Sequence, residues 1–236
     1  RHVLLVDDDP VILRGYGQRL KAEGYDVVTA ANGDEALSAA AHSITAVYNG
    51  DANFSPNTAA ALSQTVSKAD ASVTLVSSTN PAVSGQAVTF TASVSAIAPG
   101  AGTATGTVQF KTNGVNFGSA VSLSGGSATS SAISTLPVGN VTVTAVYGGD
   151  AGSNTSTATL AGGQTINKAN SSTVVSASAN PSVFGQAVTF TATVTAVSPG
   201  TGTPTGTVQF KTNGVNFGSA VTLTGGAGSS LAISSL

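Results

Sequence analysis

The stretch TGTVQFKTNGVNFGSAV at residues 105–121 decides the organisation of the chain, because the same seventeen residues return unchanged at 205–221. The shorter run GQAVTFTA likewise recurs at 85–92 and 185–192. A period near 100 residues is the length of a whole small domain, whereas the units of solenoid proteins are much shorter. The repeat therefore predicts a tandem array of small domains.

Aligning the chain with itself divides it into four parts. SITAVYNGD near residue 45 matches VTVTAVYGGD near residue 144, which marks the end of an earlier repeat. The predicted parts are a segment outside the repeats, the last strands of a partial repeat, one complete repeat and one repeat without its last two strands: 1–41, 42–69, 70–169 and 170–236.

Period-2 alternation predicts that the repeats are built from strands. In 88–94 and 141–147, apolar residues alternate with Thr or Ser, which is typical of a sheet with one buried face. Asn113-Gly114 is a strong cue for a hairpin turn. We expect a core built on Phe90, Val94, Val108, Phe110, Val143 and Tyr147. The expected strands are 72–77, 87–95, 106–112, 115–123, 127–134, 139–147 and 157–167.

These runs resemble the bacterial immunoglobulin-like (Ig-like) repeats of large surface and secreted proteins. The resemblance rests on NPxVxGQAVTFTAxV, GTxTGTVQFK and VTAVYxGDA, and it covers residues 43–236. It implies tandem β-sandwiches that serve as stalk, spacer or adhesion modules outside the cell, with neighbouring repeats as partners. It implies no catalytic site, and it leaves any protein or glycan ligand unidentified.

Residues 2–41 predict a β-α-β-α segment of a different kind. His2–Val6 is a short apolar run, Asp9 and Pro10 can begin a helix, and Gly24 can end it. Leu13, Tyr16 and Leu20 are expected on its inward face. Asp26–Ala30 follows as a second strand, then a turn at 32–33 and a short helix at 34–41.

This segment resembles the beginning of a response-regulator receiver domain, through VLLVDDDP, KAEGY and VVTAANGDEAL. The resemblance implies that Asp7 and Asp8 hold a magnesium ion, for which carboxylates are suitable ligands. The family's phosphoacceptor aspartate follows the third strand, and the sequence changes to the other family after Ala41. The alternative reading, a solvated acidic turn with a helix cap at Asp9, is therefore favoured.

The composition of the repeats argues against most kinds of catalytic, metal-binding and nucleic-acid-binding site. Residues 43–236 contain no His, Cys or Glu, which excludes the usual zinc sites, nucleophile–histidine pairs and paired catalytic glutamates. Their four lysines and three aspartates give a net charge of +1, too little to attract nucleic acid. No apolar run is long enough to span a membrane. Asp51 and Asp150 are expected to be turn residues rather than calcium ligands.

Two kinds of side chain beside the repeated hairpin have a plain structural interpretation. Lys111 and Lys211 each follow an inward phenylalanine and should face solvent. Phe117 and Phe217 are expected to cover the core rather than to stack against sugars. Neither pair predicts a binding site.

The sequence thus predicts a mostly β, non-enzymatic structural or adhesion protein of the bacterial surface, with no cofactor beyond magnesium at Asp7 and Asp8. The second hypothesis is a cytoplasmic phosphorelay regulator with a truncated receiver domain. The two hypotheses imply opposite compartments, so the junction at 41–42 is either a real fusion or an assembly artefact. The first residue is Arg1 and the chain has no methionine, so we expect a piece of something longer.

The two partial repeats carry one further expectation. Residues 43–69 align with the strands that 170–236 lacks, and an incomplete sandwich exposes sheet edges and apolar faces. We therefore expect self-association through the two incomplete sandwiches.

Overall fold

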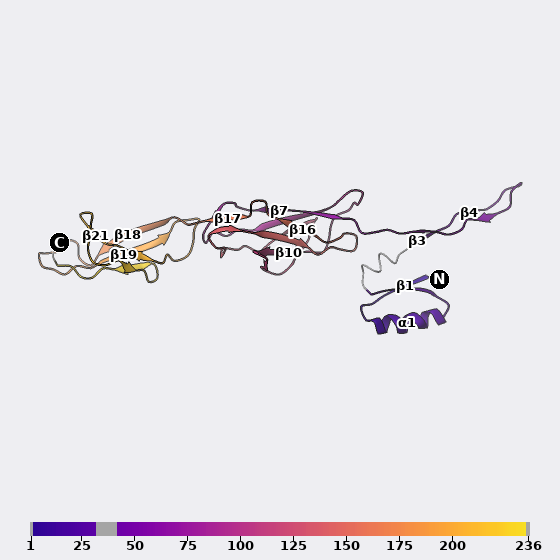
Figure 1. The fold of residues 1–236 in the computed structure, drawn as a ribbon, viewed down its shortest axis with the longest axis horizontal. Helices are drawn as coiled ribbons and strands as arrows, with labels where there is room; N and C mark the ends of the chain where they lie inside the picture. Colours follow the sequence, from indigo (N-terminus) through magenta and orange to yellow (C-terminus); the bar gives the residue numbers. More distant parts are fainter. Residues whose placement is uncertain (1, 32–41, 235–236) are drawn as a thin grey trace.

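A computed structural model of the chain describes residues 2–31 and 42–234 (Figure 1). The N-terminal unit consists of strand β1 (His2–Val6), helix α1 (Pro10–Ala22) and strand β2 (Asp26–Ala30). The two strands pair in parallel on one side of the helix. This is the expected β-α-β order, and the turn and helix expected at 32–41 lie outside the described residues.

Helix α1 begins and ends at the expected residues. The Asp9 side chain accepts a hydrogen bond of 2.8 Å from the Val11 N–H, which satisfies one of the free donors of the first turn. Pro10 occupies the first helical position, where its missing N–H costs nothing. Gly24 follows the helix with a φ of +87°, a conformation that glycine adopts most readily.

The inward face of α1 differs from the expected one at Tyr16, which is 58% exposed. Gly17 is buried instead, and a Cβ at this position would lie 3.4 Å from the Thr29 methyl group on β2. The helix approaches the sheet most closely at Gly17 because that residue has no side chain. The contact face therefore centres on Gly17, with Leu13 half-buried beside it, and Tyr16 lies outside it.

Residues 42–69, called the arm below, form two short strand pairs. Strand β3 pairs with β6 and β4 pairs with β5, both antiparallel. The four strands are β3 (His42–Ile44), β4 (Val47–Tyr48), β5 (Asn57–Thr58) and β6 (Leu62–Gln64). No residue of the arm is buried, and Val47 and Leu62 are 61% and 63% exposed.

Residues 70–169, called the first sandwich, contain three sheets. One has the order β11-β10-β15-β16, with β12 also paired to β10; the second is β13-β9-β7; the third is β14-β17-β8. The strands are β7 (Ala71–Ser77), β8 (Ala82–Val83), β9 (Phe90–Ala96), β10 (Thr107–Thr112), β11 (Val115–Asn116), β12 (Val121–Ser122), β13 (Ser127–Thr129), β14 (Gly139–Val141), β15 (Val143–Tyr147), β16 (Ser156–Thr159) and β17 (Gln164–Asn167).

The core of the first sandwich lies between the β9 and β10 sheets, where the alternation in the sequence predicts it. All six expected core residues are buried: Phe90, Val94, Val108, Phe110, Val143 and Tyr147. Phe117 packs on this core, with ring centroids 5.9 Å from Phe90 and 6.1 Å from Phe110. The interpretation of Phe117 as a core-covering residue is therefore confirmed.

Three of the expected strands are each divided in the structure, and the first of them, 115–123, gives β11 and β12, which both pair with β10. The expected strand 139–147 changes sheet after Val141, so that β14 and β15 belong to different sheets. The expected strand 157–167 is interrupted by a turn at 160–163, where Gly162 and Gly163 have φ near +70°. Each of these last two runs therefore contributes strands to two different sheets. The short strand β8 was also missed.

Residues 170–234, called the second repeat, contain counterparts of the N-terminal strands of the first sandwich. Their sheets are β18-β19-β24, β20-β23 and β21-β22. The strands are β18 (Ser171–Ala177), β19 (Phe190–Ala196), β20 (Thr207–Val208), β21 (Lys211–Thr212), β22 (Val215–Asn216), β23 (Val221–Thr222) and β24 (Ala227–Ser229). The whole fold is mostly β, with a small α/β unit at its N-terminal end.

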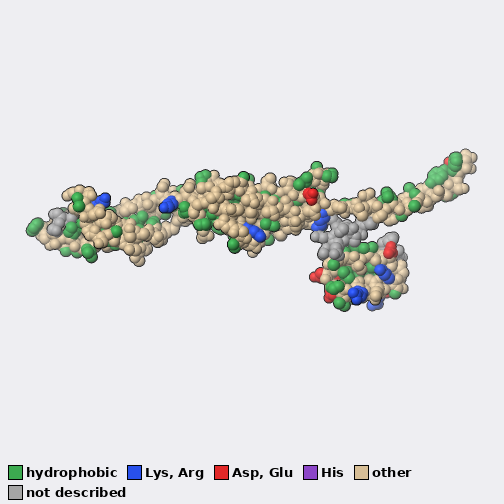
Figure 2. Space-filling view, viewed as in Figure 1, with side chains coloured by type: hydrophobic (Ala, Val, Ile, Leu, Met, Phe, Trp, Pro, Cys, Tyr) green, Lys and Arg blue, Asp and Glu red, His purple; other side chains and the backbone are tan. Residues whose placement is uncertain are grey.

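The distribution of charge follows the division into units. Figure 2 shows charged side chains gathered on the β1-α1-β2 unit, whereas the surface of the sandwiches is mostly uncharged. Within the described residues, no helix combines the length and the apolar character that crossing a bilayer requires.

Candidate functional site

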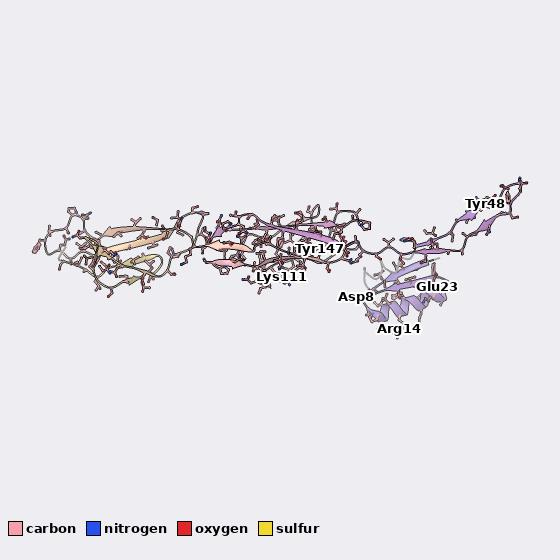
Figure 3. All side chains as sticks on the ribbon, turned by 45° about the horizontal axis from the view of Figure 1, so that its top comes forward. Asp8, Arg14, Glu23, Tyr48, Lys111 and Tyr147 are labelled. Atoms are coloured by element: carbon pink, nitrogen blue, oxygen red, sulfur yellow. The ribbon has the colours of Figure 1, made fainter. Side chains whose placement is uncertain are left out.

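The acidic turn after β1 contains the two predicted magnesium ligands. Asp7 is half-buried and Asp8 is exposed, and Figure 3 shows Asp8 at the edge of its unit. One Asp7 carboxylate oxygen accepts a 2.9 Å hydrogen bond from the Asp9 N–H. Among residues 2–31 and 42–234, no three His, Cys, Asp or Glu side chains group closely enough to hold a metal. Magnesium binding by Asp7 and Asp8 stays a prediction.

Asp150 lies in a turn of the first sandwich, and its carboxylate is the most densely hydrogen-bonded one in the described part of the chain. One carboxylate oxygen accepts from the Thr105 N–H at 2.7 Å and from the Thr105 hydroxyl at 2.9 Å. The other accepts from the Gly152 N–H at 2.9 Å, and the Asp150 carbonyl accepts from the Lys68 ammonium at 2.7 Å. Both oxygens are used within the protein, as expected for a turn residue rather than a metal ligand.

Thr105 and Lys68 are the partners that sequence reasoning missed. The antiparallel register pairs Val108 with Tyr147, and extending it by three residues in each direction brings Thr105 opposite Asp150. The repeated TGTVQF and AVYxGD runs therefore contained both partners. Predicting their contact required knowledge of the register between β10 and β15. Lys68 precedes the sandwich in the chain and joins the arm to this turn.

The turn shifts the pKa values of both of its acidic groups. Burial disfavours the charged form of Asp150, but the hydrogen bonds from Thr105 and Gly152 outweigh it and hold its pKa below the usual range. Burial, followed by the interaction with Asp150, raises the pKa of Tyr147 to about 12. The turn thus keeps Asp150 charged and Tyr147 neutral over a wide range of pH.

We expect the stability of the first sandwich to depend on pH at both extremes. Because the pKa of Asp150 is lower in the folded state, its contribution is present above about pH 4 and is lost as pH falls further. Because the pKa of Tyr147 is raised, its contribution is present below about pH 10 and is lost as pH rises towards 12. Urea unfolding followed across both ranges measures these losses.

The control for this prediction is Asp150→Asn, which keeps the shape of the side chain and removes its charge. The variant should be less stable at neutral pH and should lose much of the acid-side pH dependence. An unchanged acid-side slope in Asp150→Asn would contradict the assignment.

The second repeat presents an apolar groove of about 480 Å³ where the first sandwich is filled. We call it the open face; its apolar lining residues are Val175, Phe190, Ala192, Val208, Phe210 and Phe217. Val175 is 56% exposed, whereas its counterpart Leu75 is 9% exposed. The packing of the phenylalanine rings is the same as in the first sandwich, since the ring centroid of Phe217 lies 5.9 Å from those of both Phe190 and Phe210.

Among the described residues of the second repeat, no strand covers the open face as β15 covers its counterpart. In the first sandwich, β15 pairs with β10 from Val108 to Thr112, and Val108 is completely buried. In the second repeat, the same sequence forms only the two short strands β20 and β21, and Gln209 and Phe210 between them belong to no strand. The open face is therefore an apolar groove, and within the described residues the strand edge beside it is not paired with another strand.

Comparison with known proteins supports the two resemblances to different degrees. A family described as the bacterial Ig-like domain (group 3) matches residues 75–167. Transcriptional regulatory protein GlrR of Escherichia coli (strain K12) is 61% identical over 36 residues, 15% of this chain. Transcriptional regulatory protein QseF of Escherichia coli O157:H7 matches to the same extent. The chain spans 8% of the length of these two relatives, and no solved structure matches it significantly.

Proposed function

We propose that residues 42–236 serve as a non-enzymatic structural array of a bacterial surface or secreted protein. The observation that carries this proposal is the first sandwich itself, whose residues 75–167 match the bacterial Ig-like domain. Its most densely bonded polar group, the Asp150 carboxylate, is used entirely in joining strands and a turn. A filled core and a turn carboxylate whose two oxygens both accept hydrogen bonds within the domain suit a module that bears load or sets a distance.

The junction between the repeats also supports a spacer. The Thr201 hydroxyl donates a 2.7 Å hydrogen bond to the Gly85 carbonyl, and the Thr201 N–H lies 3.4 Å from the Ser84 carbonyl oxygen. Gly85 has a φ of +82°, and a side chain there would collide with the Thr201 backbone. A direct contact of this kind restricts the angle between consecutive units, which a spacer requires.

An antibody raised against residues 70–169 tests the proposal on cells that express the native protein. We expect it to label intact cells, and trypsin added outside the cells should remove the signal. An antibody against a cytoplasmic protein, applied to the same cells, controls for leakage. Labelling that occurs only after permeabilisation would refute a surface role.

The second candidate is a cytoplasmic response regulator, and one specific observation favours it. A 36-residue stretch is 61% identical to two transcriptional regulatory proteins, and the β1-α1-β2 unit places Asp7 and Asp8 after its first strand. In this candidate the two carboxylates would hold magnesium beside a phosphoacceptor. The same antibody experiment separates the candidates, because a cytoplasmic regulator is labelled only in permeabilised cells.

A further inference from the structure

The segment that enters the first sandwich and the segment that leaves it run side by side in the same direction. We call them the entry segment (69–83) and the exit segment (153–167). Ala69 forms a parallel bridge with Ser153 where the two segments begin. Where they end, β8 pairs in parallel with β17, and the offset between partners in the sequence is the same as at the first bridge.

Hydrogen bonds fasten the two segments at the end that follows the arm. The Ala69 N–H donates to the Gly152 carbonyl and the Asn154 N–H donates to the Ala69 carbonyl, both at 2.8 Å. The Asn154 side-chain amide donates to the Asp70 carboxylate at 2.9 Å. The chain is therefore bonded to the start of the exit segment as soon as it enters the sandwich.

A buried glutamine fastens the two segments at the opposite end. Gln164 on β17 is 0% exposed, and its amide oxygen accepts a 2.6 Å hydrogen bond from the Ser77 hydroxyl. Its amide nitrogen donates to the Thr79 carbonyl at 3.0 Å, and the Asn80 amide donates to the Gly163 carbonyl at 2.8 Å. Separating the segments here is costly, because buried polar groups would lose their partners.

Tension along the array acts on these bonds in shear. The arm and the second repeat lie at opposite ends of the first sandwich (Figure 1). A pull therefore draws the entry segment towards the arm and the exit segment towards the second repeat. Because the segments are parallel, they have to slide past each other, and their hydrogen bonds share the load. Antiparallel terminal segments would instead be peeled apart one bond at a time.

We propose that the entry and exit segments form a clamp that resists tension along the array, and that the following repeat closes this clamp. The Ser84 N–H, just after β8, donates to the Asn167 carbonyl on β17 at 2.8 Å. The next residue, Gly85, accepts the hydrogen bond from the Thr201 hydroxyl of the second repeat. The second repeat thus holds the end of β8 beside β17. This inference rests on the proposed structural role and assigns the bonds that bear the load.

Single-molecule pulling between engineered cysteines tests the clamp on the full chain, which has no natural cysteine. Handles attached through Val66→Cys and Ser172→Cys, two exposed sites on either side of the clamp, put tension across the first sandwich alone. At constant force, Gln164→Met should unfold at least about tenfold faster than the unsubstituted chain, because the partners of the buried amide lose their bonds in the folded state.

The matched control is Ser130→Ala, which also removes a buried polar group but lies outside both segments. Ser130 is 7% exposed, and its hydroxyl accepts a 3.0 Å hydrogen bond from the Phe90 N–H. Both variants should be less stable in urea, but Ser130→Ala should unfold under tension within about threefold of the unsubstituted rate. Equal acceleration of the two variants under tension would indicate general destabilisation and overturn the clamp.

Ser77→Ala is a milder variant that keeps the experiment decisive if Gln164→Met does not fold. It removes one hydrogen bond of the buried amide and leaves the glutamine in place. It should unfold roughly two- to fivefold faster under the same tension. An unchanged rate would contradict the proposal.

Thr201→Val tests whether the second repeat closes the clamp. The variant should make the first sandwich unfold roughly two- to fivefold faster under tension, although the handles put no load on residue 201 itself. Thr205→Val, at an exposed site four residues further along, should leave the rate unchanged. Equal rates for these two variants would refute closure by the second repeat. Since pulling on isolated molecules does not depend on where the protein resides, failure of the clamp and failure of the surface role are separate results.

Discussion

Replacing Phe110 with alanine is expected to lower the free energy of unfolding of the first sandwich by about 3–5 kcal/mol. Phe110 is 1% exposed on β10, and its ring packs against Phe117. Ala145 on the neighbouring strand β15 is too small to fill the space that the ring would leave. Equilibrium urea unfolding of the wild-type chain and the variant measures the loss.

The control for this prediction is Val115→Ala on the hairpin edge. Val115 is 70% exposed, so its truncation should change the free energy of unfolding by less than about 0.5 kcal/mol. A loss below roughly 1 kcal/mol for Phe110→Ala would mean that the core is not packed around this ring.

Replacing Gly106 with alanine should be the second most damaging change, at about 2–5 kcal/mol. Gly106 has a φ of +85°, which strains any other residue, and an added Cβ would lie 2.5 Å from the Gly149 carbonyl oxygen. That oxygen belongs to the turn held by Asp150, so it cannot retreat without breaking the hydrogen bonds to Thr105. Urea unfolding again reports the effect.

Gly114→Ala isolates the conformational part of this cost. Gly114 has a similar φ of +82°, but an added Cβ there meets no atom within 4 Å. It should therefore cost only about 1–2 kcal/mol. If Gly106→Ala and Gly114→Ala cost the same, the contact between β10 and the Asp150 turn does not constrain the fold.

Local patterns predicted much of the fold because they act over a few residues. Alternation identified the buried residues from Phe90 to Tyr147, since side chains of a strand point to opposite faces in turn. Asn113 and Gly114, with φ of 48° and 82°, form the predicted hairpin turn. The Asp9 cap follows equally from one residue and its neighbours.

Features that depend on distant partners were not predictable in this way. The break at Gly162 and Gly163 divides an apparently continuous run because its two ends pair in different sheets. Tyr16 lies outside the helix contact face because the sheet approaches the helix at Gly17. The contact of Thr105 with Asp150 required a register between strands that are 30 or more residues apart in the chain.

The repeated stretch at 105–121 separates the two kinds of information. By itself the sequence determined strand, turn and inward face, and both copies keep the hairpin and the packed phenylalanine rings. The sequence also predicted an exposed apolar face in the second copy, but only the tertiary structure decided its position: Val108 is fully buried in the continuous strand β10, whereas Val208 lies on the open face in the short strand β20. The physical reason is that a strand needs a neighbouring strand to pair its backbone hydrogen-bonding groups and to bury its apolar side chains. In the first copy β15 provides both, whereas the described residues of the second repeat provide neither.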